Sequence, residues 1–160
     1  MRAVLDANVV ASAVCWSGDP YLCLVKIARR QVFAFGTTDT LEETREVAAE
    51  LIREKNPKHN AAARLTWYLE RLKLVEAAPL GRQRSRDPKD DPYLAAALGA
   101  RADCIVTFDR DLLHLGKPFG MPIITPAHPV SLSIFCKEAL SETSPLPITG
   151  ILTALTNSAI

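Results

Sequence analysis

Carboxylate side chains gather at three places in the sequence, each at the expected end of a strand or the expected start of a helix. The three segments are 4–8 around Asp6, 87–92, and 106–111 around Asp109, and the pair Glu42-Glu43 is a fourth candidate. Carboxylates that share a pocket repel one another, and a fold tolerates them chiefly when a divalent cation neutralises the charge or shared protons relieve it. The pattern therefore predicts a magnesium or manganese site.

The elements that would position these side chains alternate between strands and helices. A short apolar strand, residues 3–5, ends at Asp6, and another, residues 104–107, ends just before Asp109. Further strands are predicted at 32–35, 74–77 and 122–125, and helices at 21–30, 37–55, 61–73, from Pro92 onward, 110–115 and 126–140. This alternation predicts an α/β fold with a mainly parallel sheet.

In an open parallel sheet, functional side chains collect beyond the carboxyl ends of the strands. If the strands before Asp6 and Asp109 are neighbours, their carboxylates lie side by side, and Asp91 and Glu43 at helix starts could close the pocket. Four carboxylates suit one or two hard cations. Two such ions roughly 3.5–4 Å apart can generate the attacking hydroxide and stabilise the leaving oxygen in phosphodiester hydrolysis, without a protein nucleophile.

Each of these residues also has a structural explanation. Asp91 directly precedes a proline and suits a helix N-cap, Asp109 could cap the helix after it with Asp111 in the first turn, and Glu43 with its acidic neighbours could form a solvated helix face. Asp6 is the hardest to explain in this way. A carboxylate at the end of an apolar strand is neither a usual cap nor a usual surface charge, and buried charges need partners or metals.

A basic loop lies directly before the second acidic segment. Its positive side chains are Arg82, Arg84, Arg86 and Lys89. Such a loop could hold the phosphate backbone of a nucleic acid while the metal site cuts it, or it could be an ordinary solvated surface.

Length and composition indicate one domain. The chain has 160 residues, 48% of them hydrophobic and 23% charged, with a net charge of +1 that neither favours nor excludes nucleic-acid binding. The four cysteines form no C-x-x-C pair, which predicts free buried thiols. With no signal-peptide pattern and no membrane-length apolar run, a cytoplasmic protein is expected.

Four segments in this order resemble the PIN-domain ribonucleases, above all the branch assigned as toxins of bacterial toxin–antitoxin systems. They are Val-Leu-Asp-Ala-Asn-Val-Val-Ala-Ser-Ala, Thr-Leu-Glu-Glu-Thr-Arg-Glu-Val, Arg-Asp-Pro-Lys-Asp-Asp-Pro-Tyr-Leu-Ala-Ala-Ala and Ala-Asp-Cys-Ile-Val-Thr-Phe-Asp-Arg-Asp-Leu-Leu. The resemblance covers about residues 1–135, and it implies a PIN-like nuclease domain over residues 1–137 followed by a carboxyl-terminal tail of unassigned role over 138–160. It implies a three-layer α/β/α sandwich, RNA cleavage dependent on Mg²⁺ or Mn²⁺, a homodimer or higher even oligomer, and an antitoxin protein that blocks the site.

The resemblance also assigns roles to residues. The catalytic, metal-binding acids fall on Asp6, Glu43, Asp91 and Asp109, an extra metal-binding carboxylate falls on Asp111, and supporting polar positions fall on Asn8 and Thr107. Thr44 stands where the family usually has leucine, which leaves the choice between Glu42 and Glu43 open. Two other hypotheses of function remain. The protein could be a non-catalytic PIN-like domain that binds RNA or a partner, or it could be an aspartate-based phosphatase, although Asn8 stands where such phosphatases usually have their second aspartate.

Overall fold

A five-stranded sheet forms the centre of the computed structural model, which describes residues 1–127. The strands are β1 (Arg2–Leu5), β2 (Phe33–Gly36), β3 (Lys73–Leu74), β4 (Cys104–Val106) and β5 (Ile123–Ile124). They lie in the order β3-β2-β1-β4-β5, and every pair is parallel. The predicted α/β fold is confirmed, with a sheet that is entirely parallel.

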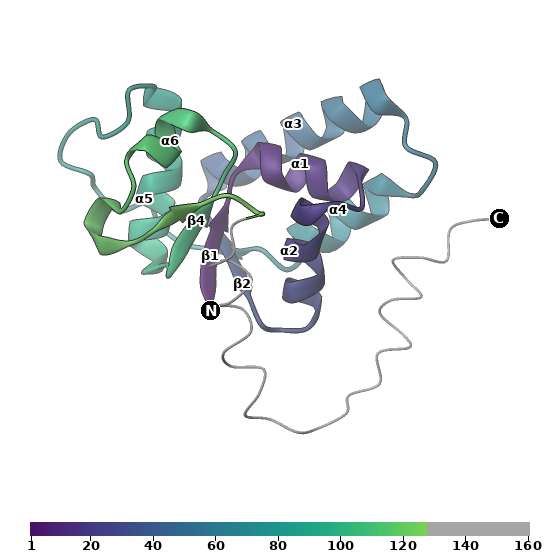
Figure 1. The fold of residues 1–160 in the computed structure, drawn as a ribbon, viewed down its shortest axis with the longest axis horizontal. Coiled ribbons are helices and arrows are strands. Elements are labelled where there is room, and N and C mark those ends of the chain that lie inside the picture. Colours follow the sequence, from purple (N-terminus) through teal and green to yellow (C-terminus); the bar gives the residue numbers. More distant parts are fainter. Residues whose placement is uncertain (128–160) are drawn as a thin grey trace.

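Helices flank the sheet on both sides (Figure 1). They are α1 (Ala7–Cys15), α2 (Asp19–Ala28), α3 (Thr38–Lys55), α4 (Ala61–Leu69), α5 (Asp91–Ala100) and α6 (Arg110–His114), with short 3-10 turns at Pro88–Asp90 and Pro118–Gly120. The apolar side chains of α1, α2 and α4 join the core on one face of the sheet, and those of α5 and α6 join the core on the other. The arrangement is the predicted three-layer sandwich.

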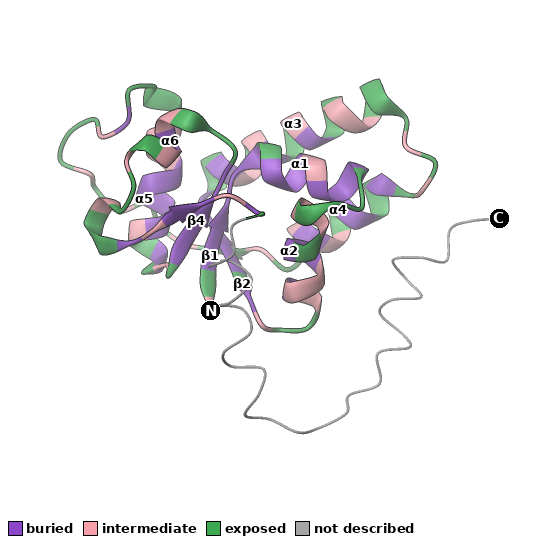
Figure 2. Ribbon diagram, viewed as in Figure 1, coloured by how far each residue is buried: buried purple, intermediate pink, exposed green. Residues whose placement is uncertain are grey.

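The two cores follow from the alternation of side chains along each strand. In β1, Ala3 and Leu5 face the core shared with α1, whereas Val4 faces the core shared with α5. In β4, Ile105 likewise points opposite to its two neighbours. Because both faces are covered, the central strands are buried along nearly their whole length, as Figure 2 shows. Burial on both faces is why the sequences of these strands are continuous runs of apolar residues.

The strand order reverses between β1 and β4. From β1 the chain passes outward to β2 and β3, and it then returns to place β4 on the other side of β1. Leu5 pairs with Val106, so the residues that follow these two strands emerge next to each other. The predicted neighbourhood of the two strands is confirmed, and it lies at the switch point where open α/β sheets bind ligands.

Several element bounds differ from those predicted. The sequence pattern gave no helix after Asp6, but α1 begins at Ala7, since a run of small and β-branched residues packs there between the sheet and α3. The predicted helix 61–73 ends at Leu69, and Lys73 belongs instead to β3, which is shorter than the predicted strand 74–77. The predicted helix 126–140 lies almost entirely outside the described residues, as does the predicted domain boundary at residue 137.

Two expectations about composition can be compared with the described residues. Cys15, Cys23 and Cys104 are free and buried, as predicted, and Cys136 lies outside the described part. Within residues 1–127, no helix combines the length and apolar character that a membrane crossing requires.

Candidate active site

Asp6 lies in the acidic crevice, as we call the region beyond the carboxyl ends of β1 and β4 where the acidic residues gather. It follows β1, it is 4% exposed, and its side chain caps α1 by accepting the backbone N–H of Asn8 at 3.1 Å. The expectation that Asp6 is not a cap is therefore wrong, because the unforeseen helix α1 begins directly after it. Asn8 contacts Asp6 only through this backbone group, and its own side chain is exposed.

Thr107 joins Asp6 to Asp109. The fully buried Thr107 hydroxyl donates to one carboxylate oxygen of Asp6 and accepts the backbone N–H of Asp109 at 2.8 Å. Asp109 in turn caps α6, accepting the N–H groups of Asp111 at 2.7 Å and Leu112 at 3.2 Å. The predicted capping role of Asp109 is confirmed, and the Thr107 hydroxyl links the Asp6 carboxylate to the backbone N–H of Asp109.

Glu43 approaches the site through Tyr93. The Tyr93 hydroxyl donates to Glu43 at 2.8 Å and accepts the backbone N–H of Ala7, the residue after Asp6, at 3.2 Å. Glu42 is exposed and Glu43 is half-buried, so the contact favours Glu43 of the two.

The position of Glu43 depends on how α3 begins. Thr37 and Thr40 form a reciprocal capping box there. Gly36 leaves room for that cap, because a Cβ at this position would lie 2.8 Å from the Thr40 hydroxyl oxygen. The start of α3, and with it Glu43, is thus fixed at the end of β2.

Asp90 and Asp91 accept hydrogen bonds from different groups of the preceding loop. The Asp91 carboxylate accepts the backbone N–H of Arg84 at 3.1 Å and that of Ser85 at 2.8 Å, which fastens the preceding loop. Asp90 accepts the Ser85 hydroxyl at 2.6 Å. The prediction that Asp91 is the N-cap of α5 is wrong: a 3-10 turn runs directly into the helix, so Asp90 takes the cap position and Asp91 the first helical one.

The basic loop reaches the acidic crevice at one residue. Arg86 pairs with Asp111 at 2.9 Å, although the Arg86 side chain is 86% exposed. Arg84 is half-buried and its guanidinium donates to the Leu80 carbonyl, whereas Arg82 and Lys89 are exposed. The loop therefore presents its charges along the rim, with Arg86 directly beside the carboxylates.

Two carboxyl groups of the crevice have raised pKa values. Burial raises the pKa of Asp6, the hydrogen bonds from Thr107 and Asn8 oppose the shift, and the charge of Asp109 adds to it. Burial also raises the pKa of Asp90, the Ser85 hydrogen bond opposes the shift, and the charges of Asp109, Asp87 and Asp111 add to it. Burial and these like charges disfavour the ionised forms of both carboxyl groups, and a bound cation would relieve the repulsion.

A comparison with protein families agrees with this geometry. The PIN domain family matches residues 2–111. The chain belongs to the PIN-domain family. The chain has no significant match among curated proteins and none among solved structures. PIN domains are a family of nucleases that typically bind Mg²⁺.

The donor set of this PIN domain suits a hard cation. The charge of Asp109 acts on both Asp6 and Asp90, and Glu43 is linked through the Tyr93 hydroxyl to the residue after Asp6. In the described part of the chain, no three acidic, histidine or cysteine side chains lie close enough together to enclose an ion. Such a cage is not what Mg²⁺ needs, since it usually keeps several waters and binds through one or two carboxylates plus substrate phosphates.

Sequence reasoning missed three polar members of the PIN-domain crevice. Asp90 directly precedes Asp91, the residue that was expected to contribute. A run of acidic residues and prolines does not show at which residue a helix begins, so the two aspartates could not be distinguished. Tyr93 resembled an ordinary apolar position of a helix, although a tyrosine among alanines carries a hydroxyl that needs a partner when buried. Ser85 gave no signal beyond its place in a polar loop.

Proposed function

We propose that the protein is a Mg²⁺- or Mn²⁺-dependent endoribonuclease that hydrolyses RNA phosphodiester bonds as the toxin of a toxin–antitoxin pair. One observation carries the proposal: the Thr107 hydroxyl donates to the Asp6 carboxylate and accepts the backbone N–H of Asp109, which places both aspartates at the strand switch point in a chain of the PIN-domain family. The toxin role rests on the sequence resemblance given above.

Asp6, Asp109 and Glu43 would hold the cation, and Asp111 would add a further carboxylate at the rim. The Asp90-Asp91 pair would add one more acid: the resemblance assigns Asp91, whereas the effect of the Asp109 charge on Asp90 supports Asp90. When bound, the ion would supply a water nucleophile of lowered pKa and stabilise charge on the reacting phosphate.

The chain's own residues orient the acids and the substrate. Thr107 and Tyr93 donate to Asp6 and Glu43 respectively, so each carboxylate keeps a fixed direction toward the crevice. Arg86, with Arg82, Arg84 and Lys89 on the same loop, would hold the RNA backbone beside the acids. These positive groups lie outside the acidic centre and leave it free for the cation.

Cleavage of single-stranded RNA by the purified full-length protein tests the proposal. We expect cleavage with Mg²⁺ or Mn²⁺, none in excess chelator, and a loss of about 100-fold or more in Asp6→Asn and in Glu43→Gln. Glu50→Gln is the matched control for Glu43→Gln, because Glu50 lies on the same helix with a side chain that is 74% exposed. Its activity should equal that of the wild type.

Other outcomes would identify the competing functions. Cleavage that survives both the chelator and Asp6→Asn would overturn the metal-dependent mechanism. RNA binding without cleavage would indicate a non-catalytic PIN domain, and a phosphoaspartyl adduct on Asp6 would indicate a phosphatase.

The toxin role and the partners require separate tests. Induced expression should arrest bacterial growth for the wild type and not for Asp6→Asn, and co-expression of an antitoxin-like reading frame from beside its gene should restore growth. Light scattering should give a homodimer or a higher even oligomer. Growth arrest by Asp6→Asn equal to that by the wild type would refute a toxin that acts through RNA cleavage.

A further inference from the structure

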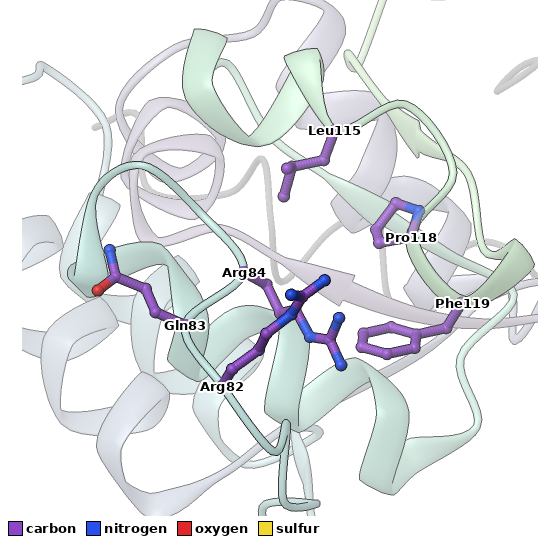
Figure 3. Close-up of a pocket in the computed structure, with 6 residues that line it drawn as sticks. All are labelled: Arg82, Gln83, Arg84, Leu115, Pro118 and Phe119. Carbon is purple, nitrogen blue, oxygen red and sulfur yellow. The ribbon is translucent and has the colours of Figure 1, made fainter.

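A pocket of about 380 Å³ lies between the basic loop and the segment after α6. Its walls are formed by Arg82, Gln83, Arg84, Leu115, Pro118 and Phe119. In Figure 3 the side chains of Arg82, Arg84 and Phe119 point toward one another, while Gln83 points away. The lining combines an aromatic ring with two guanidinium groups and includes no acidic side chain.

Phe119 is exposed in a strained backbone conformation. Its φ of +56° lies in the left-handed region, which costs a non-glycine residue on the order of 1 kcal/mol or more, yet 47% of the residue is exposed. Hydrogen bonds from Gly120 to Lys117 and from Met121 to Pro118 close the tight turn around it. The fold thus holds an aromatic ring out toward solvent, where the ring gains little from burial, and such strain often marks a binding site.

Arg84 is fixed beside this ring from two directions. Its guanidinium carbon lies 5.2 Å from the Phe119 ring centroid, and its Nε and Nη2 donate to the Leu80 carbonyl at 3.2 Å and 2.9 Å. Its backbone N–H is held by the Asp91 carboxylate. The same short loop therefore forms a wall of the pocket and contacts an acid of the candidate active site.

We propose that this pocket takes one unpaired nucleobase of the RNA substrate, stacked on Phe119 beside Arg84. This inference rests on the proposed ribonuclease function. Aromatic rings with neighbouring arginines are how proteins bind single-stranded RNA, since every base has a π-face and the backbone follows positive charge. Arg82, which also lines the pocket, would bind a phosphate of the same strand, and Arg86 of the same loop pairs with Asp111. A stacked base would anchor the strand with an adjacent phosphate directed toward the carboxylates.

The test measures RNA affinity in the full-length protein carrying Asp6→Asn, so that cleavage does not interfere. Fluorescence anisotropy with a labelled single-stranded RNA in Mg²⁺ would compare Phe119→Leu, which keeps an apolar side chain without a ring, with Phe119→Trp, which keeps a ring. Phe33→Leu is the matched control, because Phe33 is also exposed and has the Lys73 ammonium 4.4 Å from its ring centroid, but it lies on β2. We expect Phe119→Leu to weaken binding roughly 5- to 150-fold, with affinity unchanged in the other two variants.

A set of RNAs with one abasic position each then identifies the stacked base. At a single position, removal of the base should weaken binding as much as Phe119→Leu does, and the two changes together should cost no more than either alone. The proposal of a base pocket would be overturned if the losses of RNA affinity from Phe119→Leu and from base removal were additive at every position. It would also be overturned if Phe119→Leu and Phe33→Leu weakened RNA binding equally. Unchanged RNA affinity in Phe119→Leu with loss of antitoxin binding would also overturn it and identify a protein as the occupant.

The two proposals fail in different ways. If the wild-type protein cleaves RNA with Mg²⁺ but shows no coupling between Phe119 and any base, only the pocket proposal fails. If coupling is found without cleavage, the nuclease proposal fails and the base pocket stands. Absence of any RNA binding would overturn both.

Discussion

Asp6→Asn should make the cation-free protein more stable while it abolishes cleavage. The Asp6 carboxylate is 4% exposed and lies near the charge of Asp109, and these two conditions disfavour its ionised form. Asparagine removes the charge but keeps an oxygen that can cap α1, and asparagine caps about as well as aspartate. Its amide group can also donate to the Thr107 hydroxyl, which retains the link between β1 and β4, although the hydroxyl proton then loses the acceptor that Asp6 provides.

The expected size of the gain follows from opposing effects. Relief of burial and repulsion stabilises the variant, while loss of a negative charge at the start of α1 costs about 0.3–1 kcal/mol. Single stabilising substitutions commonly contribute about 0.5–2 kcal/mol. After the loss at the helix start is subtracted, we expect a net gain of about 0.5–1 kcal/mol, or about 1–4 °C in melting temperature for a chain of this length. Asp6→Ala should instead be destabilised, because it loses the cap and leaves the Thr107 hydroxyl without its acceptor.

The gain should depend on pH in a defined direction. The folded pKa of Asp6 is raised above its unfolded value near 3.8, so protonation favours the folded state. Its contribution to stability is fully present below that unfolded value and is lost as the pH rises through the folded pKa. The stability difference between Asp6→Asn and the wild type should therefore be small near pH 4 and grow toward neutral pH.

Chemical denaturation in chelator across this pH range measures the difference, and Mg²⁺ provides a second comparison. At a concentration ten times its dissociation constant, the cation should stabilise the wild type by about 1.4 kcal/mol and Asp6→Asn by clearly less. A variant that is less stable than the wild type at pH 7, or a difference that does not change with pH, would refute the claim that charge on Asp6 opposes folding.

Two other substitutions test the links between the acids. Tyr93→Phe leaves the Ala7 N–H without its side-chain acceptor and Glu43 without a donor, so thermal melts should show a loss of about 1–3 kcal/mol and the cleavage assay a lower rate. Unchanged stability would contradict that bridge. Asp90→Asn should lower Mg²⁺ affinity in calorimetry more than Asp91→Asn does, whereas Asp91→Asn should lose about 0.5–1.5 kcal/mol of stability because one oxygen that holds the loop becomes a donor. Equal or reversed Mg²⁺ affinities would instead favour Asp91 as the ligand.

The sheet was predictable because its strands are buried on both faces. Apart from Arg2, the residues of β1 and β4 are apolar, and each run ends abruptly at polar residues. This pattern alone identified both the strands and the edge of the sheet where the acids lie. The helix α1 was missed for the same reason: Val9, Val10 and Val14 are buried, so its apolar run lacks the polar face that helical periodicity requires. With α1 missing, Asp6 could not be recognised as its cap.

The site was predictable at strand ends and less so at helix starts. A strand fixes the direction of the residue that follows it, so Asp6 and Asp109 could be paired from the sequence once their strands were taken as neighbours. A helix start turns each successive residue by about 100°, so one position decides whether a carboxylate faces the loop or the crevice. The Asp91 carboxylate accepts a backbone N–H of the loop, whereas the charges of Asp109 and Asp111 act on the pKa of Asp90. This difference between two neighbouring aspartates cannot be predicted from the sequence of the segment.

Hydroxyl groups, more than positive charges, connect the acids of this crevice. The Thr107 hydroxyl holds Asp6, the Tyr93 hydroxyl holds Glu43 and the Ser85 hydroxyl holds Asp90. Among residues 1–127, the ion pair between Arg86 and Asp111 is the only one that involves a carboxylate of the site, and it lies at the exposed rim. A neutral donor orients a carboxylate without cancelling its charge, whereas an arginine in the centre would fill the place of a cation. The hydroxyl donors therefore leave in place the negative charge that a metal ion would neutralise. Because this charge is not cancelled in the absence of a cation, ionised Asp6 is predicted to destabilise the folded state.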